Sequence, residues 1–180
     1  MEDTNSLIQI RIDKINEIRD TFGINPFPYK YDVTHYSSGI IADFDRFFES
    51  QEKVSVAGRI MAVRIMGKAS FCTIQDKEGK IQLYIAGANI DELHYNLFKK
   101  LDLGDIIGVK GTVKKTKTDE ITVFIDELTL LSKNIRPLPV VKEKDGEMFD
   151  LFADKELRYR QRYLDLIMSE QTRQTFLIRS

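Results

Sequence analysis

Residues 54–86 read VSVAGRIMAVRIMGKASFCTIQDKEGKIQLYIA, and this stretch decides the fold. It is rich in β-branched and apolar residues, and it is interrupted by a glycine at 67 and by the turn Glu78-Gly79. Apolar runs bounded by turn residues predict strands that follow one another as a meander. A glycine inside such a run, as at Gly58, is typical of a bulge or a sharp bend. We therefore expect three consecutive strands that curve.

The next 45 residues change their periodicity twice. Residues 91–101 repeat leucine at every fourth position, which indicates a helix, and residues 105–115 and 120–131 again have the composition of strands. Three strands, a helix and two strands is the order of the OB fold, a small barrel. We predict a mainly β chain with flanking helices, in which a five-stranded OB-fold barrel (β-β-β-α-β-β) occupies residues 54–132.

The segments on either side of the barrel are expected to be mostly helical. Residues 5–22 have the three-and-four spacing of an amphipathic helix, and residues 40–49 predict a shorter helix. We assign residues 1–53 to an N-terminal helix and an extension that pack on the barrel. Residues 133–150, which contain RPLP and KEKDG, read as a linker, and residues 151–180 as the start of a second, helical domain.

Composition excludes several classes of site. Cys72 is the only cysteine of the 180 residues, so neither an intramolecular disulfide nor a thiolate zinc site is possible. The two histidines, His35 and His94, are far apart in the sequence, and we expect no metal site. A phosphate loop, a nucleophile–base pair and a carboxylate pair with acid–base spacing are all missing, so no catalytic residue and no cofactor site is expected. The sequence shows no long apolar run and no signal peptide, which favours a cytoplasmic protein without a membrane partner.

Strand alternation marks one face of the barrel as unusual. Cys72 points to the predicted core, whereas Phe71 lies on the opposite, otherwise polar face, and Gln82 lies on the polar face of the next strand. An exposed ring is suited to stacking on a base, and an amide both donates to and accepts from a base edge. The alternative is that a neighbouring helix or loop covers Phe71, and that Tyr84 packs beneath the N-terminal helix.

Two loops extend this face. We expect Arg64 and Lys68 between the first and second strands, and Lys115 and Lys117 between the fourth and fifth, the two loops that OB folds commonly use on nucleic acids. Cations there would neutralise phosphates. The carboxylate of Glu120 would instead accept a hydrogen bond from a base and contribute selectivity. The alternative is that KTKT, residues 115–118, is an ordinary solvated hairpin tip.

Several segments resemble the class II lysyl-tRNA synthetases, in that family's order. VAGRIMAVRIMGKASFCTIQDKEGKIQLYI is similar to the family's anticodon-binding barrel, and NPFPYKYDVTH, the KTKT tip, RPLP and LRYRQRYLDLI also match its pattern. The resemblance runs from about residue 5 to the end. Aspartyl and asparaginyl enzymes share the barrel and a YRYLDL-like run, but the forms GINPFPYKY and RYRQRYLDL look more like the lysyl branch.

The resemblance implies an anticodon reader. Phe71 would stack on an anticodon base, and Gln82 would hydrogen-bond the central uracil. Arg64 would contact an anticodon base or its phosphate, and Glu120 would help to discriminate the third base. The implied partner is the anticodon stem-loop of a tRNA with a UUU-type anticodon.

The resemblance places the chemistry of aminoacylation outside this chain. The helix ending in FLIRS would lead into the catalytic domain, so residues 151–180 would be its incomplete start, and the sequence ends at Ser180 before the three class II motifs. The full-length parent would be a lysine–tRNA ligase, a homodimer that binds ATP and magnesium. We expect this chain to bind tRNA without aminoacylating it.

Three other functions remain to be distinguished. An anticodon domain of an aspartyl or asparaginyl enzyme would read a different anticodon. A free-standing OB protein that binds single strands would have similar affinity for any short pyrimidine strand. An interaction domain whose barrel face is covered by the N-terminal helix would bind no RNA.

Overall fold

The computed structural model describes residues 2–67, 69–139, 142–144, 147–149 and 155–179. The chain divides into two compact units, residues 1–137 and 138–180, each of which is described by itself. Lys68, one of the expected site residues, lies outside the described residues.

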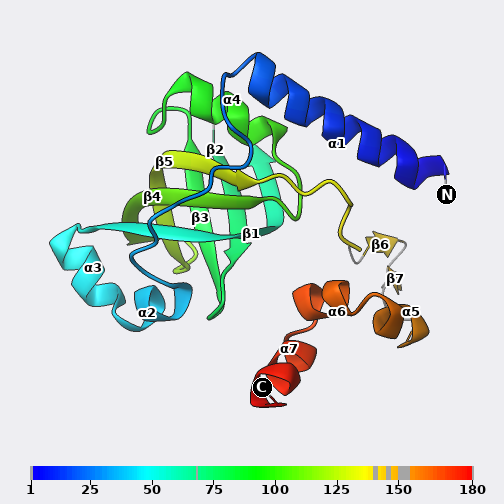
Figure 1. The fold of residues 1–180 in the computed structure, drawn as a ribbon. Helices are drawn as coiled ribbons and strands as arrows, with labels where there is room; N and C mark the ends of the chain where they lie inside the picture. Colours follow the sequence, from blue (N-terminus) through cyan, green and yellow to red (C-terminus); the bar gives the residue numbers. More distant parts are fainter. Residues whose placement is uncertain (1, 68, 140–141, 145–146, 150–154, 180) are drawn as a thin grey trace. The chain divides into compact units, whose positions relative to one another are not determined.

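The first unit is built on a closed barrel. Its elements are β1 (Lys53–Met66), β2 (Ala69–Gln75), β3 (Lys80–Ala86), α4 (Glu92–Lys100), β4 (Ile106–Lys115) and β5 (Ile121–Ser132). The strands close in the order β1-β2-β3-β5-β4, with β4 pairing back onto β1 (Figure 1). All neighbours are antiparallel except β3 and β5, which are parallel. The predicted five-stranded β-β-β-α-β-β barrel is therefore confirmed.

The core of the barrel follows the expected alternation on β2 and β3. The inward side chains of these two strands are at most 3% exposed: Cys72, Ile74, Ile81, Leu83 and Ile85. Their outward neighbours, such as Phe71 and Gln82, are partly exposed. Helix α4 adds Leu97 and Phe98 to the same core. Since the inward residues are apolar except for Ser70, the barrel interior is filled, and only the outer face is available for recognition.

A bulge in β1 decides which residues of that strand face outward. Ile60 pairs with Ile74, but Ala62 pairs with Thr73, so Met61 is an extra residue without a partner on β2. Because side chains alternate with a period of two, one extra residue exchanges the two faces of the strand. Arg64, an even-numbered residue like the buried Ile60, is thereby turned to the outer face.

The N-terminal helix α1 (Glu2–Asp20) begins three residues before the predicted start and ends two before the predicted end. Only its C-terminal half carries buried apolar side chains, Ile15 and Ile18. Two ion pairs also join α1 to the barrel and its helix α4: Lys14 Nζ lies 2.6 Å from Asp102 Oδ1, and Glu17 pairs with Lys100 of α4. The predicted helix is thus present, but it packs on the barrel over only part of its length.

Residues between α1 and β1 form an extension and two short helices. The predicted helix at 40–49 is in fact two, α2 (Ser37–Ala42) and α3 (Phe44–Ser50), because the backbone leaves helical geometry at Asp43. Tyr31, in the extension, lies against β4, where an added Cβ on Gly108 would meet its ring at 2.4 Å. Glycine at that position therefore allows the extension to lie directly on the barrel.

The described residues of the second unit form two short strands and three helices. The strands are β6 (Lys142–Lys144) and β7 (Glu147–Phe149), and the helices are α5 (Lys155–Arg160), α6 (Arg162–Met168) and α7 (Glu170–Arg179). The segment read as a linker, 133–150, is thus divided: its first five residues belong to the barrel unit, and its second half holds the paired strands. In α6 the carboxylate of Asp165 is buried and pairs with Arg158 and Arg162. In the described part of the chain, no helix combines the length and hydropathy needed to cross a membrane.

Candidate nucleic-acid interface

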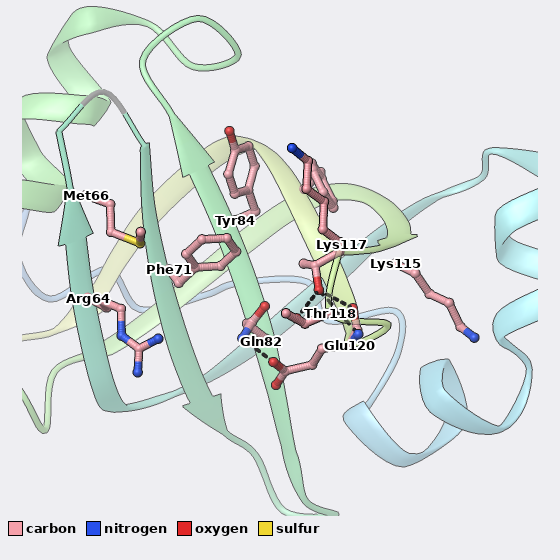
Figure 2. Close-up of a pocket in the computed structure, with 11 residues that line it drawn as sticks. Arg64, Met66, Phe71, Gln82, Tyr84, Lys115, Lys117, Thr118 and Glu120 are labelled. Atoms are coloured by element: carbon pink, nitrogen blue, oxygen red, sulfur yellow. Dashed lines mark hydrogen bonds between the residues drawn. The ribbon is translucent and has the colours of Figure 1, made fainter.

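Four outward-facing residues lie in one row across the barrel. The strand registers pair Arg64 on β1 with Phe71 on β2, Phe71 with Tyr84 on β3, and Tyr84 with Phe124 on β5. Side chains opposite one another on neighbouring strands contact each other on the same face of a sheet. The row therefore consists of one guanidinium followed by three rings, which we call the aromatic row (Figure 2).

The three rings are spaced for packing without covering one another. The Phe71 and Tyr84 centroids are 5.3 Å apart at an interplanar angle of 58°, and those of Tyr84 and Phe124 are 4.7 Å apart at 40°. These tilted arrangements lie in the range that aromatic pairs prefer. Phe71 and Tyr84 both remain partly exposed and line an open cavity of about 540 Å³. Of the two interpretations of Phe71, an exposed stacking surface fits this geometry.

A second row of polar residues lies beside the aromatic row. Thr73 pairs with Gln82, and Gln82 pairs with Thr122 on β5. The Gln82 amide is bound at both ends: Nε2 donates to Glu120 Oε2 at 2.6 Å, and Oε1 accepts from Thr122 Oγ1 at 2.8 Å. The Thr122 side chain is fully buried, whereas Glu120 is exposed. This row supplies hydrogen-bonding groups beside the stacking surface.

The turn between β4 and β5 brings Glu120 to this position. Thr116 N donates to Glu120 O at 3.0 Å, and Asp119 N donates to Thr116 O at 3.0 Å. Asp119 has a φ of 63°, in the left-handed region that aspartate tolerates better than most residues. The backbone of this turn is thus closed by its own hydrogen bonds, so Glu120, the residue immediately before β5, is held within hydrogen-bonding distance of Gln82.

Six of the seven expected site residues line the same cavity. They are Arg64, Phe71, Gln82, Lys115, Lys117 and Glu120. The seventh, Lys68, lies outside the described residues. The lining also includes residues that the sequence reading did not assign to the site: Met66, Tyr84, Thr116, Thr118 and Phe124. Alternation already placed Tyr84 on the outer face, whereas Phe124 reaches the site only because β5 pairs with β3.

Two of the expected positions differ from the structure in detail. Arg64 lies within β1 and not in the following loop, because β1 continues to Met66. Lys115 is the last residue of β4, and only Lys117 lies in the turn. Lys115 also points away from the aromatic row: its Nζ lies 3.0 Å from Asp119 Oδ1 and 5.2 Å from the ring centroid of Phe44 (Figure 2).

The thiol of Cys72 is not directed at the cavity. The Cys72 thiol lies on the inner face, and burial raises its pKa to about 12, so it remains a neutral thiol at physiological pH. Across the described ranges, 2–67, 69–139, 142–144, 147–149 and 155–179, no group of three or more His, Cys, Asp or Glu residues could hold a metal ion. The arrangement is suited to binding: rings for stacking, an amide and a carboxylate for base edges, and cations for phosphates.

Comparison with known proteins agrees with this description. Residues 54–131 match the family model of the OB-fold nucleic acid binding domain that includes tRNA anticodon-binding domains. The chain is 48% identical over 179 residues to a lysine–tRNA ligase of Porphyromonas gingivalis, an alignment that covers 95% of this chain and 31% of the relative. It is 52% identical over 165 residues to the lysine–tRNA ligase of Azobacteroides pseudotrichonymphae, covering 88% of this chain and 33% of that protein. The chain thus spans about a third of the length of the curated relatives it matches.

Proposed function

We propose that this chain reads the anticodon of a lysine tRNA as part of a lysine–tRNA ligase. The proposal starts from two findings: the barrel matches an OB-fold nucleic acid binding domain, and the chain is homologous to the N-terminal part of lysine–tRNA ligases. The observation that carries the proposal is the aromatic row beside the bound amide of Gln82. A stacking surface combined with a directional hydrogen-bonding group is what recognition of unpaired RNA bases requires.

Phe71 supplies the stacking surface in this proposal. Its ring is partly exposed and leans on Tyr84, which in turn leans on Phe124. Such support holds the first ring in place without covering its free face. A base stacked on Phe71 would gain about 1–3 kcal/mol, whatever its identity. Stacking therefore provides affinity, and selection among bases must come from other groups.

The polar row and the cations complete the recognition. Gln82 lies on the strand next to Phe71, so a base stacked on the ring would present its edge to the amide. Arg64 is paired with Phe71 and is suited to a phosphate or to the base itself. Glu120 would help to discriminate the third anticodon base. Lys117, in the exposed turn, would approach a phosphate.

The remainder of the reaction belongs to other parts of the whole enzyme. The described residues offer no carboxylate or histidine cluster suited to magnesium, and the matched third of the relatives contains the binding barrel. We assign ATP-dependent activation of lysine, the ATP and magnesium it needs, and homodimer formation to the full-length parent, in the cytoplasm. This chain alone would bind tRNA without aminoacylating it.

Titration with anticodon stem-loops tests the proposal. The chain is mixed with a loop carrying UUU, with loops changed at the central or third anticodon base, and with an unstructured pyrimidine strand. We expect the UUU loop to bind at least about tenfold more tightly than each alternative, because one well-placed base contact discriminates by that amount or more. Equal affinity for all four RNAs would indicate a non-selective single-strand binder. Tightest binding to a loop with C as the third base would point to an aspartyl type of enzyme.

A further inference from the structure

The side-chain amide of Gln82 has a definite orientation in the free protein. Nε2 faces the carboxylate of Glu120 at 2.6 Å, and Oε1 faces the hydroxyl of Thr122 at 2.8 Å (Figure 2). These three residues come from β3, from the turn that precedes β5, and from β5 itself. The orientation therefore depends on the parallel pairing of β3 with β5, which sets Gln82 opposite Thr122.

Glu120 is the group that prevents the amide from turning over. A carboxylate only accepts hydrogen bonds, so it accepts from the NH₂ end of the amide and repels the oxygen end. Rotating the amide by half a turn would place Gln82 Oε1 against Glu120 Oε2, which would lose a hydrogen bond and bring two partial negative charges together.

Thr122 supports this orientation but would not determine it alone. Its hydroxyl both donates and accepts, and it also lies 3.1 Å from the backbone oxygen of Glu120. If the amide were turned over, the hydroxyl could donate to that oxygen and accept from Gln82 Nε2. In the observed orientation the buried Thr122 hydroxyl lies closer to Gln82 Oε1, at 2.8 Å, than to the Glu120 backbone oxygen, at 3.1 Å, so its hydrogen bond to the amide adds stability to the orientation that Glu120 selects.

The orientation matters because the two pyrimidines differ in the order of their hydrogen-bonding groups. At positions 4 and 3, uracil presents an acceptor and then a donor, O4 and N3–H. Cytosine presents a donor and then an acceptor, the N4 amino group and N3. A glutamine amide that turned freely would match either base in the same stacked position. An amide of fixed orientation matches only one of them.

We infer that Glu120 and Thr122 act as positioning residues that hold the Gln82 amide in one orientation, and that this orientation discriminates uracil from cytosine at the base stacked beside Gln82. The inference rests on the proposed function and adds a second task to Glu120 besides its contact with the third base. It also assigns a task to Thr122, a buried residue that does not line the cavity.

Two substitutions of nearly unchanged size test the inference. Glu120→Gln replaces the carboxylate by an amide that accepts from or donates to Gln82 equally well, which frees Gln82 to turn over. Thr122→Val removes the hydroxyl and leaves Glu120 in place. Thr129→Val is the matched control, because Thr129 lies on the same strand, is partly exposed and does not line the cavity. Each variant is titrated with the UUU stem-loop and with two loops that carry C instead of U, one at the central and one at the third anticodon position.

We expect Glu120→Gln to reduce the preference for U over C by about tenfold, the amount one base-edge contact supplies. Thr122→Val should reduce it by roughly threefold, since the deciding carboxylate is retained. Thr129→Val should leave the preference unchanged. Far-ultraviolet circular dichroism of all three variants shows whether each one folds.

Different outcomes separate failure of this inference from failure of the proposed function. If the unaltered chain does not prefer the UUU loop, the proposed function is wrong. If it does, but Glu120→Gln and Thr122→Val both keep the full preference for U over C, the positioning role is wrong. A Glu120→Gln variant that changes discrimination only at the third anticodon base would likewise overturn the positioning role, because Glu120 would then act on that base alone.

Discussion

Replacing Lys133 by methionine should destabilise the barrel unit far more than removal of an exposed lysine would. Lys133 follows β5, and its side chain is fully buried. Its ammonium group donates to Asp105 Oδ2 at 2.7 Å, where the carboxylate is also fully buried, and to Asp102. Asp102 additionally accepts from Lys14 of α1 at 2.6 Å. The lysine therefore ties the end of the barrel, the segment before β4 and the N-terminal helix into one cluster.

The expected cost follows from the charge that the substitution leaves behind. Methionine preserves most of the volume and removes the cation, so Asp105 becomes a buried carboxylate without its counter-ion. Loss of one partner of a buried ion pair costs about 3–5 kcal/mol. That is a large part of the roughly 5–15 kcal/mol by which a typical domain is stable. Lys110→Met is the matched control: its pair with Glu127 is exposed, and such pairs contribute about 1 kcal/mol or less.

The cost of Lys133→Met should also depend on pH. Burial raises the pKa of Asp105 above its ordinary value, against the attraction of Lys133. A raised pKa means that the folded state binds the proton more readily, which favours folding at low pH and is lost as pH rises through the folded pKa. Burial acts in the same direction on Asp102, but hydrogen bonds from Lys133 and Lys14 outweigh it, and its pKa is lowered. Removing Lys133 would raise the pKa of Asp105 further and would also raise the lowered pKa of Asp102, so the cost should be largest near pH 7 and smaller near and below the ordinary carboxyl pKa of 3.8.

Cys72 provides the assay. It is the only cysteine of the sequence, it is buried in the barrel core, and its pKa is raised by burial, so the folded barrel protects it from thiol reagents. Labelling with a dithiodipyridine, which reacts with thiols even in acid, is followed across a urea series at pH 7 and pH 4. A cost for Lys133→Met no greater than that of Lys110→Met, or a cost that grows toward acid pH, would refute the reasoning.

Three further predictions concern the interface and its support. Phe71→Ala should weaken binding of the anticodon stem-loop by about 1–3 kcal/mol through loss of stacking; titration that gives equal affinities for variant and unaltered chain would contradict the role of the ring. Lys115→Ala should reduce the slope of log K against log salt by about one or less, because this lysine is already paired with an aspartate, and a change in base preference would show that it reads bases. Asp76→Ala should lower the free energy of unfolding by about 1–3 kcal/mol, since the carboxylate accepts hydrogen bonds from Ser37 N at 2.6 Å and Ser37 Oγ at 2.7 Å as well as from its own turn. Cys72 labelling across a urea series measures this loss, and an unchanged urea midpoint would contradict the prediction.

The parts of the site that the sequence predicted are those governed by local periodicity. On β2 and β3, one residue in two faces the core, and the side chains there are chemically distinct enough for the pattern to be read without a structure. This placed Phe71 and Gln82 on one outer face, as the strand register now shows. The sequence placed Arg64 only in a loop, and the anticodon contacts of Arg64 and Glu120 came from the resemblance to lysyl-tRNA synthetases, because strand alternation did not place either residue on the outer face.

The pairing register of β1 and β5 with their neighbouring strands could be determined only from the tertiary structure. The extra residue at Met61 exchanges the faces of β1 and brings Arg64 beside Phe71, and nothing in the composition of that strand marks where the extra residue falls. The parallel pairing of β3 with β5 joins segments about forty residues apart and places Phe124 against Tyr84. Such long-range pairings depend on the closing of the whole barrel.

The sequence by itself therefore determined the order of the elements, the apolar core and the outer residues of two strands, because these follow from the alternation of neighbouring residues. Tertiary structure alone decided that three rings form a row and that Gln82 is held between Glu120 and Thr122. The physical reason is that a ring contact or a hydrogen bond across the barrel requires a register accurate to one residue. That register is set by the bulge in β1 and by the closure of β5 onto β3, both of which depend on packing around the whole barrel.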